Sequence, residues 1–486
     1  MNKTIRRASV FTLLLVLALL GRATWVQFYE SEALADNDHN RRKVIAQYAH
    51  PPGDIIVAGK AVTGAERTKG GDLAYKRAYV DGDLYSAVTG FSSQIYGATQ
   101  LEGVYQDVLD GSDQRVRSVM DTANGEPGKP GNVITTIDPA VQKAAYDALG
   151  DKKGAAVAID PASGEILGMV STPSYDPGVF AGNSTDDSRA WDALEKDKDK
   201  PLVNRALKQA LAPGSTFKLV VAAAALEDGI YANVDEPTDS PDPYTLPGTS
   251  TVLRNESASA PCENATLRTA LQYSCNNVFA KLADDLGRDK LRKTAEAFGF
   301  NDTEQDVPVR AAKSNYPDKA DPAQTGLTGI GQFEVTATPL QMAMVSATIA
   351  NGGVQAGPHM ASQVTDSGGD VVEDLAGQAK ERTRRVVGKD TADQLRSAMR
   401  TVVEQGTGVN ARIAGATVGG KTGTAQNGVN NSNNPYAWFT SYADGGDGKQ
   451  VAVAVLVESS DARRDEISGN GLAAPIAKAM MQAALR

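Results

Sequence analysis

Residues 8–21, ASVFTLLLVLALLG, are the segment that most constrains the fold, because they hold no charged side chain and follow three cations. Continued past Arg22 to Phe28, the segment is just long enough for a helix to cross a bilayer core of about 30 Å. The leading cations predict an N-terminus that stays inside. A cleaved signal peptide is the alternative, because Gly21 and Ala23 resemble a small-x-small cleavage site. In both cases we expect the rest of the chain to leave the cytoplasm.

The composition is that of a folded, acidic protein. The 486 residues allow about two to four domains. A hydrophobic fraction of 41% and a charged fraction of 22% are ordinary for globular proteins. The net charge of -10 argues against nucleic acid as a partner, because binding to phosphates needs a basic surface.

The pattern of apolar runs and turn residues divides the remaining chain into two units. Residues 30–54 read as a polar helical stalk, and short strand-like pieces up to about residue 130, such as 75–88, predict a small β-rich unit. Near residue 154 a second unit begins with a predicted β-hairpin, GAAVAID and GEILGMVS. Helices separate this hairpin from three late strands, so we predict an α+β fold whose sheet is assembled from both ends of the unit.

Local signals place several helices of the second unit. Asp138 and Thr338 are each followed by proline, which is typical of a helix start. The stretch LVVAAAALEDG, residues 219–229, is apolar on nearly all sides and predicts a buried helix. The segment from residue 181 to 200 is polar and is expected to be a surface excursion.

The stretch PGSTFK places Ser215 and Lys218 three residues apart at the start of that buried helix. They therefore share one helix face, one turn apart. A desolvated lysine has a lowered pKa and is able to act as a base towards a serine nucleophile. Alone the pattern is weak, because S-x-x-K arises by chance roughly once or twice in such a chain. A serine in this position also serves as an ordinary helix N-cap.

A second candidate group is Ser274-Cys275-Asn276, at the end of a predicted helix. A hydroxyl and an amide two residues apart would relay a proton and bind a substrate amide, although for this motif taken alone a turn asparagine is the simpler explanation. Cys275 also stands close to Cys262. In an oxidising compartment this pair is either a disulfide or two reduced thiols.

The third group is Lys421, Thr422, Gly423 and Thr424 in a glycine-rich predicted strand. The pleat points Lys421 and Gly423 to one face and the threonines to the other. A bulge or a twist at the preceding glycines would re-aim them, and glycine lets a substrate backbone lie close to the strand. K-T-G is rare by chance, with about 0.1 to 0.2 expected occurrences.

The order S-x-x-K, S-x-N, K-T-G is characteristic of β-lactamases and penicillin-binding proteins. With GAAVAIDPASGEILGMVSTPSYDP and GIGQFEVTATPLQMA, the chain resembles the class B penicillin-binding proteins, in particular the actinobacterial D,D-transpeptidases of the penicillin-binding protein A type. The resemblance is close from about residue 130 to the end and looser over 30–130. Pro52 departs from the arginine common in the family.

The resemblance implies a peptidoglycan D,D-transpeptidase that is acylated by β-lactam antibiotics. Ser215 would attack the stem peptide with Lys218 as base, and Ser274 with Lys421 would pass a proton to the leaving D-alanine. The residues implied in substrate binding are Asn276, Thr422, Gly423 and Thr424. No metal and no organic cofactor is implied.

The resemblance also implies an architecture and a location. A cytoplasmic tail and membrane anchor would occupy residues 1–29, and a non-catalytic pedestal residues 30–150. A transpeptidase domain, an antiparallel sheet with helices on both faces, would occupy 151–486. The protein would cross the plasma membrane once, with the catalytic domain outside. A glycan polymerase of the SEDS family, in a division or elongation complex, is an implied partner.

Other functions use the same site. A D,D-carboxypeptidase differs only in taking water as acceptor, a serine β-lactamase hydrolyses its acyl-enzyme, and a β-lactam sensor or divisome scaffold is not catalytic. The three histidines give no catalytic pattern. Two lysines so close would disfavour each other's protonation, so Lys421 is expected to lower the pKa of Lys218.

Overall fold

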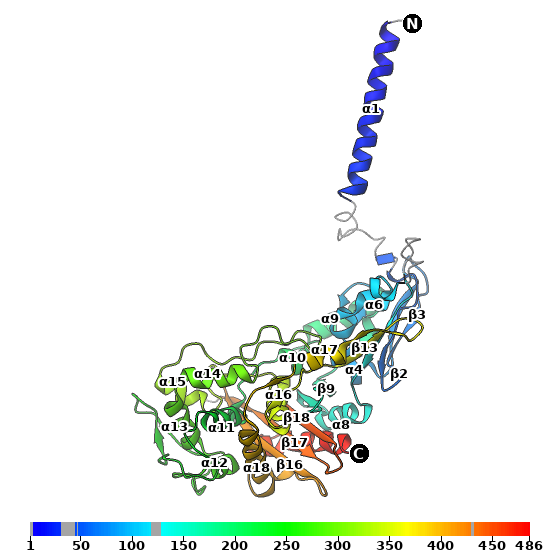
Figure 1. Cartoon of the computed structure of the whole chain (residues 1–486). Coiled ribbons are helices and arrows are strands. Elements are labelled where there is room, and N and C mark those ends of the chain that lie inside the picture. Colours follow the sequence, from blue (N-terminus) through cyan, green and yellow to red (C-terminus); the bar gives the residue numbers. More distant parts are fainter. Residues whose placement is uncertain (1–2, 31–43, 46, 118–127, 429–431) are drawn as a thin grey trace. The chain divides into compact units, whose positions relative to one another are not determined.

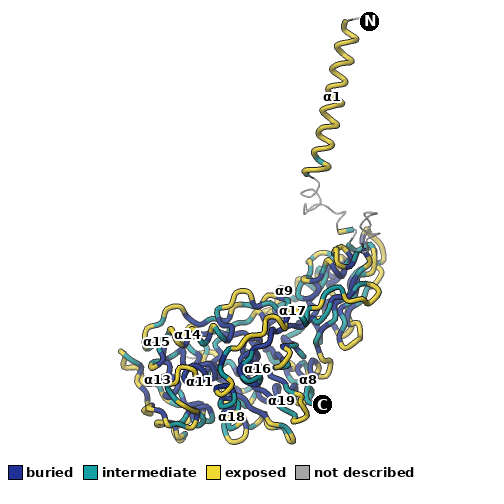
Figure 2. Tube along the Cα trace, viewed as in Figure 1, coloured by how far each residue is buried: buried dark blue, intermediate teal, exposed yellow. Residues whose placement is uncertain are grey.

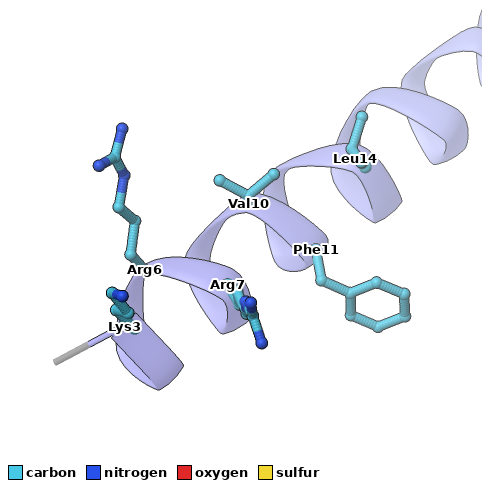
Figure 3. Close-up of a pocket in the computed structure, with 6 residues that line it drawn as sticks. All are labelled: Lys3, Arg6, Arg7, Val10, Phe11 and Leu14. Atoms are coloured by element: carbon cyan, nitrogen blue, oxygen red, sulfur yellow. The ribbon is translucent and has the colours of Figure 1, made fainter.

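The computed structural model describes residues 3–30, 44–45, 47–117, 128–428 and 432–486. The N-terminal helix α1 (Lys3–Phe28) has no buried residue and a mean hydropathy of 1.9 over its most apolar stretch (Figures 1 and 2). Within the described ranges it is the one helix long and apolar enough to cross a membrane. Figure 3 shows its cationic first turns. Most of the predicted stalk, residues 31–43 and 46, lies outside the described residues.

The core of the main unit is a five-stranded antiparallel sheet in the order β16-β17-β18-β8-β9. The early hairpin supplies two strands and the C-terminal segment supplies three, which confirms the predicted α+β class. The strands are β8 (Lys153–Ile159), β9 (Ile166–Thr172), β16 (Thr417–Asn427), β17 (Asn433–Asp444) and β18 (Gln450–Ser459).

Helices cover both faces of this sheet, as the resemblance implied. Along β18, the valines from Val451 to Val457 pack with α8 (Pro139–Leu149) and α19 (Ala474–Ala484). The alternate residues Ala452, Ala454 and Leu456 belong to the opposite core, with α11, α16 and α18 (Figure 1). Because alternate side chains of β18 face opposite cores, both faces of the strand are buried, and this explains why β18 is apolar throughout. These three helices are α11 (Lys218–Glu227), α16 (Pro339–Ala350) and α18 (Lys389–Gln405).

Both predicted helix starts are confirmed. The Asp138 side chain accepts hydrogen bonds from the backbone N–H groups of Ala140 and Val141 at the start of α8. Thr338 accepts from Gln341 at the start of α16. In each helix the proline occupies the first turn, where its missing N–H has no helical partner to lose.

A second five-stranded sheet has the order β14-β13-β7-β1-β2. It joins β1 (Ile55–Val57), β2 (Lys60–Ala61) and β7 (Asn132–Thr135) to β13 (Ala361–Thr365) and β14 (Val371–Asp374). No local pattern marks residues 361–374 as the completion of a sheet begun more than two hundred residues earlier, because that pairing is non-local.

Two local predictions were incomplete. Within 75–88 only β4 (Tyr75–Tyr79) is a strand, whereas α4 (Gly82–Thr89) is a helix that buries Tyr85 and Val88 at a spacing of three. The polar segment 181–200 contains the helix α9 (Thr185–Lys196), which begins with a capping box at Ser184. The remaining α-helices of five or more residues in the described ranges are α5 (Gln100–Val104), α6 (Gln106–Asp110), α12 (Leu267–Tyr273), α13 (Asn276–Leu286), α14 (Arg288–Ala297), α15 (Pro322–Thr328) and α17 (Leu375–Glu381).

Candidate active site

Ser215 lies in the 3-10 turn η3 (Gly214–Phe217), directly before α11. This turn packs closely on β16. A Cβ atom added to Gly423 would lie 2.8 Å from the carbonyl oxygen of Pro213, and Gly214 itself has φ 53. Glycine is therefore needed at both points to hold the turn, and with it Ser215, beside the strand.

Lys218, the first residue of α11, is fully buried. Its Nζ donates to the Ser274 carbonyl oxygen at 2.8 Å and to Asn276 Oδ1 at 2.8 Å, and it lies 3.3 Å from Ser274 Oγ. No hydrogen bond joins Lys218 to Ser215 in the described part of the chain. A neutral amine has two N–H donors and one lone pair. The two acceptors at 2.8 Å take the donors and leave the lone pair free to receive a proton.

Ser274 is the C-cap of α12 and has a left-handed backbone, with φ 60. This conformation is uncommon for a serine, and it is often found where a site requires a particular orientation. Ser274 Oγ lies 3.0 Å from Nζ of Lys421, which is also fully buried and reaches it from β16. The two lysines, which come from different elements, thus meet at one hydroxyl group.

The pKa values of both lysines are lowered. Burial is the main cause of the lowered pKa of Lys218, and the positive charge of Lys421 adds to it, as the sequence led us to expect. Burial lowers the pKa of Lys421 to about 7. The carboxylate of Glu256 acts in the opposite direction on the pKa of both lysines. A neutral Lys218 is the form that a general base needs.

The K-T-G strand pairs regularly with its neighbour at the glycines. β16 pairs with β17 without interruption from Thr417 to Ala425, and the register shifts only after Ala425. Of the two devices considered for the glycines, a bulge or a twist, the bulge is therefore absent between Thr417 and Ala425. Without a bulge, the side chain of Lys421 is still long enough for its Nζ to contact Ser274 Oγ. The hydroxyl of Thr422 lies 2.8 Å from that of Thr407, while Thr424 lines the cavity at Ser215.

A cavity of about 450 Å³ opens at Ser215, and Asn276 and Thr424 also line it. Asn276 donates its side-chain amide to the carbonyl oxygen of Arg254 at 3.0 Å, and its backbone N–H donates to Asn255 Oδ1 at 2.6 Å. These bonds orient the amide that contacts Lys218.

Of the predicted site residues, Ser215, Asn276 and Thr424 line this cavity, and Lys218 is hydrogen-bonded to Asn276. Ser274 contacts Lys218, and Lys421 contacts Ser274, so both join the cavity only through Lys218. Thr422 instead contacts Thr407, and Gly423 gives η3 its close approach to β16.

The structure decides between the alternatives for the cysteines. Cys262 and Cys275 form a disulfide, with their Cα atoms 5.6 Å apart. Both are buried, and Cys275 stands between Ser274 and Asn276. The bridge therefore ties the turn that carries two site residues to the preceding loop.

Sequence reasoning missed three residues at the site. Asn255 holds the start of α13, Glu256 lines the cavity, and Thr407 contacts Thr422. Asn255 and Glu256 lie in a polar loop that carries no motif, so no local signal marks them. Of the described histidines, neither His50 nor His359 lines the cavity, and the remaining histidine lies outside the described residues.

Comparison with known proteins agrees with this geometry. Residues 154–482 match the penicillin binding protein transpeptidase domain, and residues 52–133 match the penicillin binding protein A dimerisation domain. The chain belongs to the penicillin-binding protein transpeptidase family. The family resemblance of the motifs is therefore confirmed, and so is the fold that it implied.

Several relatives of this penicillin-binding protein span its whole length. The peptidoglycan D,D-transpeptidase PbpA of Mycolicibacterium smegmatis is 37% identical over 100% of this chain and 99% of its own. PbpA of Mycobacterium tuberculosis is 36% identical with the same coverage. The penicillin G acyl-enzyme complex of M. tuberculosis penicillin-binding protein A matches with a TM-score of 0.81 and 35% identity. That match covers 90% of this chain and 100% of the other.

Proposed function

We propose that this penicillin-binding protein is a peptidoglycan D,D-transpeptidase that joins stem peptides through an acyl-serine and is acylated by β-lactams. The observation that carries the proposal is the meeting of two buried lysines at Ser274 Oγ, because one of them, Lys218, follows Ser215 by one helical turn. Their contacts at 3.3 Å and 3.0 Å would form a relay for protons. Such a relay suits amide cleavage, because the departing amine must gain the proton that the serine loses.

In the proposed reaction Ser215 Oγ attacks the carbonyl carbon between the last two D-alanines while Lys218 takes its proton. The C–N bond then breaks, and Ser274, tuned by Lys421, passes a proton to the departing D-alanine. An amine of a neighbouring stem peptide next attacks the acyl-serine and restores the serine. Asn276 would bind the acyl group. Thr422, Gly423 and Thr424 would hold the carboxyl-terminal side of the donor along β16.

The remaining architecture is part of the proposal. Residues 1–29 would form a cytoplasmic tail and membrane anchor, 30–150 a pedestal, and 151–486 the catalytic domain. The chain would cross the plasma membrane once with its catalytic domain outside. A membrane glycan polymerase of the SEDS family would supply the glycan strands.

The test is intact-protein mass spectrometry after treatment with benzylpenicillin, followed by peptide mapping. We expect one stable adduct on Ser215, none in Ser215→Ala, and loss of cross-linking activity in that variant. An adduct on another residue would overturn the mechanism. Fast turnover of the antibiotic would favour a β-lactamase, and cross-linking that survives Ser215→Ala would favour a scaffold.

A further inference from the structure

The short loop after α18 contacts two parts of the site at once. α18 ends at Gln405, and the backbone N–H groups of Gly406 and Gly408 both donate to the carbonyl oxygen of Val402, at 3.1 Å and 3.0 Å. These bonds satisfy a carbonyl group at the helix end and close the loop tightly against the helix. Thr407 lies between the two glycines, so its backbone and its side chain are presented at a fixed place.

The backbone of this loop is attached to the helical turn that ends in Ser274. The Thr407 N–H donates to the carbonyl oxygen of Gln272 at 3.1 Å, and the Gln272 side-chain amide donates to the Gln405 carbonyl oxygen at 3.1 Å. A Cβ atom on Gly406 would lie 2.5 Å from the Gln272 oxygen. Gln272 stands in the last turn of α12, two residues before Ser274, so the loop packs directly on the end of α12.

The side chain of Thr407 is attached to β16. Its hydroxyl lies 2.8 Å from that of Thr422, which is buried. The backbone carbonyl oxygen of Thr422 accepts from Lys421 Nζ at 3.0 Å, and the same Nζ donates to Ser274 Oγ at 3.0 Å. One path of contacts therefore leads from Thr407 through β16 to Lys421, and a second path leads through α12 to Ser274.

Thr407 thus closes a ring of contacts around the pair of Ser274 and Lys421. These two residues come from different elements, so the distance between them depends on how α12 and β16 are held together. The lysines Lys218 and Lys421 also disfavour each other's charge. Their repulsion opposes the approach of β16 to Ser274, and a direct hydrogen bond between the loop and the strand resists it.

We propose that Thr407 is a positioning residue that keeps Ser274 and Lys421 at hydrogen-bond distance by joining the end of α12 to β16. Thr407 is not among the residues that line the cavity at Ser215, so it acts through these two elements without touching a substrate. The inference rests on the proposed function, because it assumes that the contact between Lys421 and Ser274 serves the acylation of Ser215. A misplacement of about 1 Å at such a contact is enough to slow a reaction about a hundredfold.

The test compares Thr407→Val with Thr407→Ser in the full chain. Valine keeps the shape of threonine and removes the hydroxyl, whereas serine keeps the hydroxyl and removes the methyl group. Acylation of Ser215 is followed by intact mass over a range of benzylpenicillin concentrations, which separates the limiting rate from the half-saturating concentration. We expect Thr407→Val to lower the limiting rate about tenfold and to change the half-saturating concentration by less than about a factor of two. Thr407→Ser should keep most of the wild-type rate.

A pH profile distinguishes this role from a general loss of stability. The charge of Lys421 contributes to the lowered pKa of Lys218, and Glu256 acts in the opposite direction on the pKa of both lysines. When Lys421 is no longer held at Ser274, we expect it to move away from Lys218, whose pKa then rises. As the pH is lowered, acylation by Thr407→Val should therefore fall at a pH about half a unit or more above that of wild type, because Lys218 must be neutral. A variant that is only less stable would keep the wild-type profile.

Two further variants test the route and the specificity of the effect. If Thr407 acts through Thr422, adding Thr407→Val to Thr422→Val should slow acylation by less than about a further factor of two, because each change removes the same hydrogen bond. Thr269→Val is the matched control. It removes a part-buried contact between two threonine hydroxyls, with Thr266, in the first turn of the same helix α12. This control should keep the wild-type rate and pH profile.

The outcomes separate this inference from the proposed function. A limiting rate and a pH profile that Thr407→Val leaves unchanged would contradict the positioning role, and so would equal losses in Thr407→Ser or in Thr269→Val. We expect the circular dichroism spectrum of each variant to match that of wild type, so that the rates belong to folded protein. Wild-type protein that benzylpenicillin does not acylate at Ser215 would instead overturn the proposed function.

Discussion

At the scale of single residues, the enclosed pair of lysines is the feature that most needs an explanation. Burial makes a charged ammonium costly, and a second ammonium nearby makes it costlier. Lys218 Nζ has two acceptors at 2.8 Å, the Ser274 carbonyl oxygen and Asn276 Oδ1, and a longer contact of 3.3 Å with Ser274 Oγ, a hydroxyl that is able to donate as well as accept. That set of partners suits a neutral amine, which is also the form that accepts a proton from serine.

Lys218→Arg tests this reading of Lys218. Arginine fits a similar length of side chain but stays protonated, so it has no lone pair to receive the proton of Ser215. We expect acylation by benzylpenicillin to slow by about 10²- to 10⁴-fold, measured as the rate of adduct formation by mass spectrometry. Lys208→Arg, at an exposed lysine, should acylate at the wild-type rate. A Lys218→Arg rate close to wild type would contradict the role of Lys218 as base.

The lowered pKa of Lys421 predicts how the free energy of unfolding changes with pH. Its pKa is about 7 in the folded protein, against an ordinary value of 10.5. Between these values the unfolded chain binds a proton that the folded protein does not. The free energy of unfolding should therefore rise with pH across this window, by up to about 1.4 kcal/mol per pH unit, and the effect of Lys421 should level off below pH 7.

Urea unfolding of wild type and Lys421→Met at pH 7, 8 and 9 measures this contribution. Subtracting the two curves removes the groups whose pKa is the same in both proteins, and it leaves Lys421 together with its effect on the pKa of Lys218. We expect the stability of wild type relative to Lys421→Met to increase with pH. Parallel curves would show that Lys421 titrates at an ordinary pKa in the folded protein.

At the scale of elements, the site depends on how closely β16 and η3 approach each other. Gly423→Ala would place a methyl group 2.8 Å from the Pro213 oxygen, which is too close without a shift of one element. We expect a loss of about 1 to 3 kcal/mol in the free energy of unfolding and slower acylation at Ser215. Gly64→Ala is the control, because a Cβ there meets nothing within 4 Å. Acylation unchanged in Gly423→Ala would mean that this contact does not position Ser215.

Elements defined by local chemistry were predictable from the sequence, and those defined by distant partners were not. The starts of α8 and α16 follow from a capping side chain and a proline that stand next to each other. The strand β13 pairs with β7, so that Val364 lies opposite Val133, and no local pattern announces that partner. The same holds within the site. The three motifs predicted which residues gather, whereas Asn255 enters it only through a fold that places its loop on α13.

At the scale of the whole molecule, α1 has a role separate from that of the catalytic unit. It has no buried residue, and its apolar side chains require a surrounding other than water. The cations of its first turns, Lys3, Arg6 and Arg7, precede the apolar stretch (Figure 3). This arrangement favours a membrane helix whose short leading end stays on the cytoplasmic side.

Deletion of residues 1–29 tests the anchor. We expect the full chain to remain in the membrane fraction after high-salt and carbonate washing, because a helix of this length inserts into the bilayer. The deleted chain should be soluble and should still form the benzylpenicillin adduct, with a rate within about a factor of two of the full chain, because α1 contributes no residue to the site. A membrane-extracted protein whose N-terminal sequence began near Thr24 would show instead that the segment is a cleaved signal.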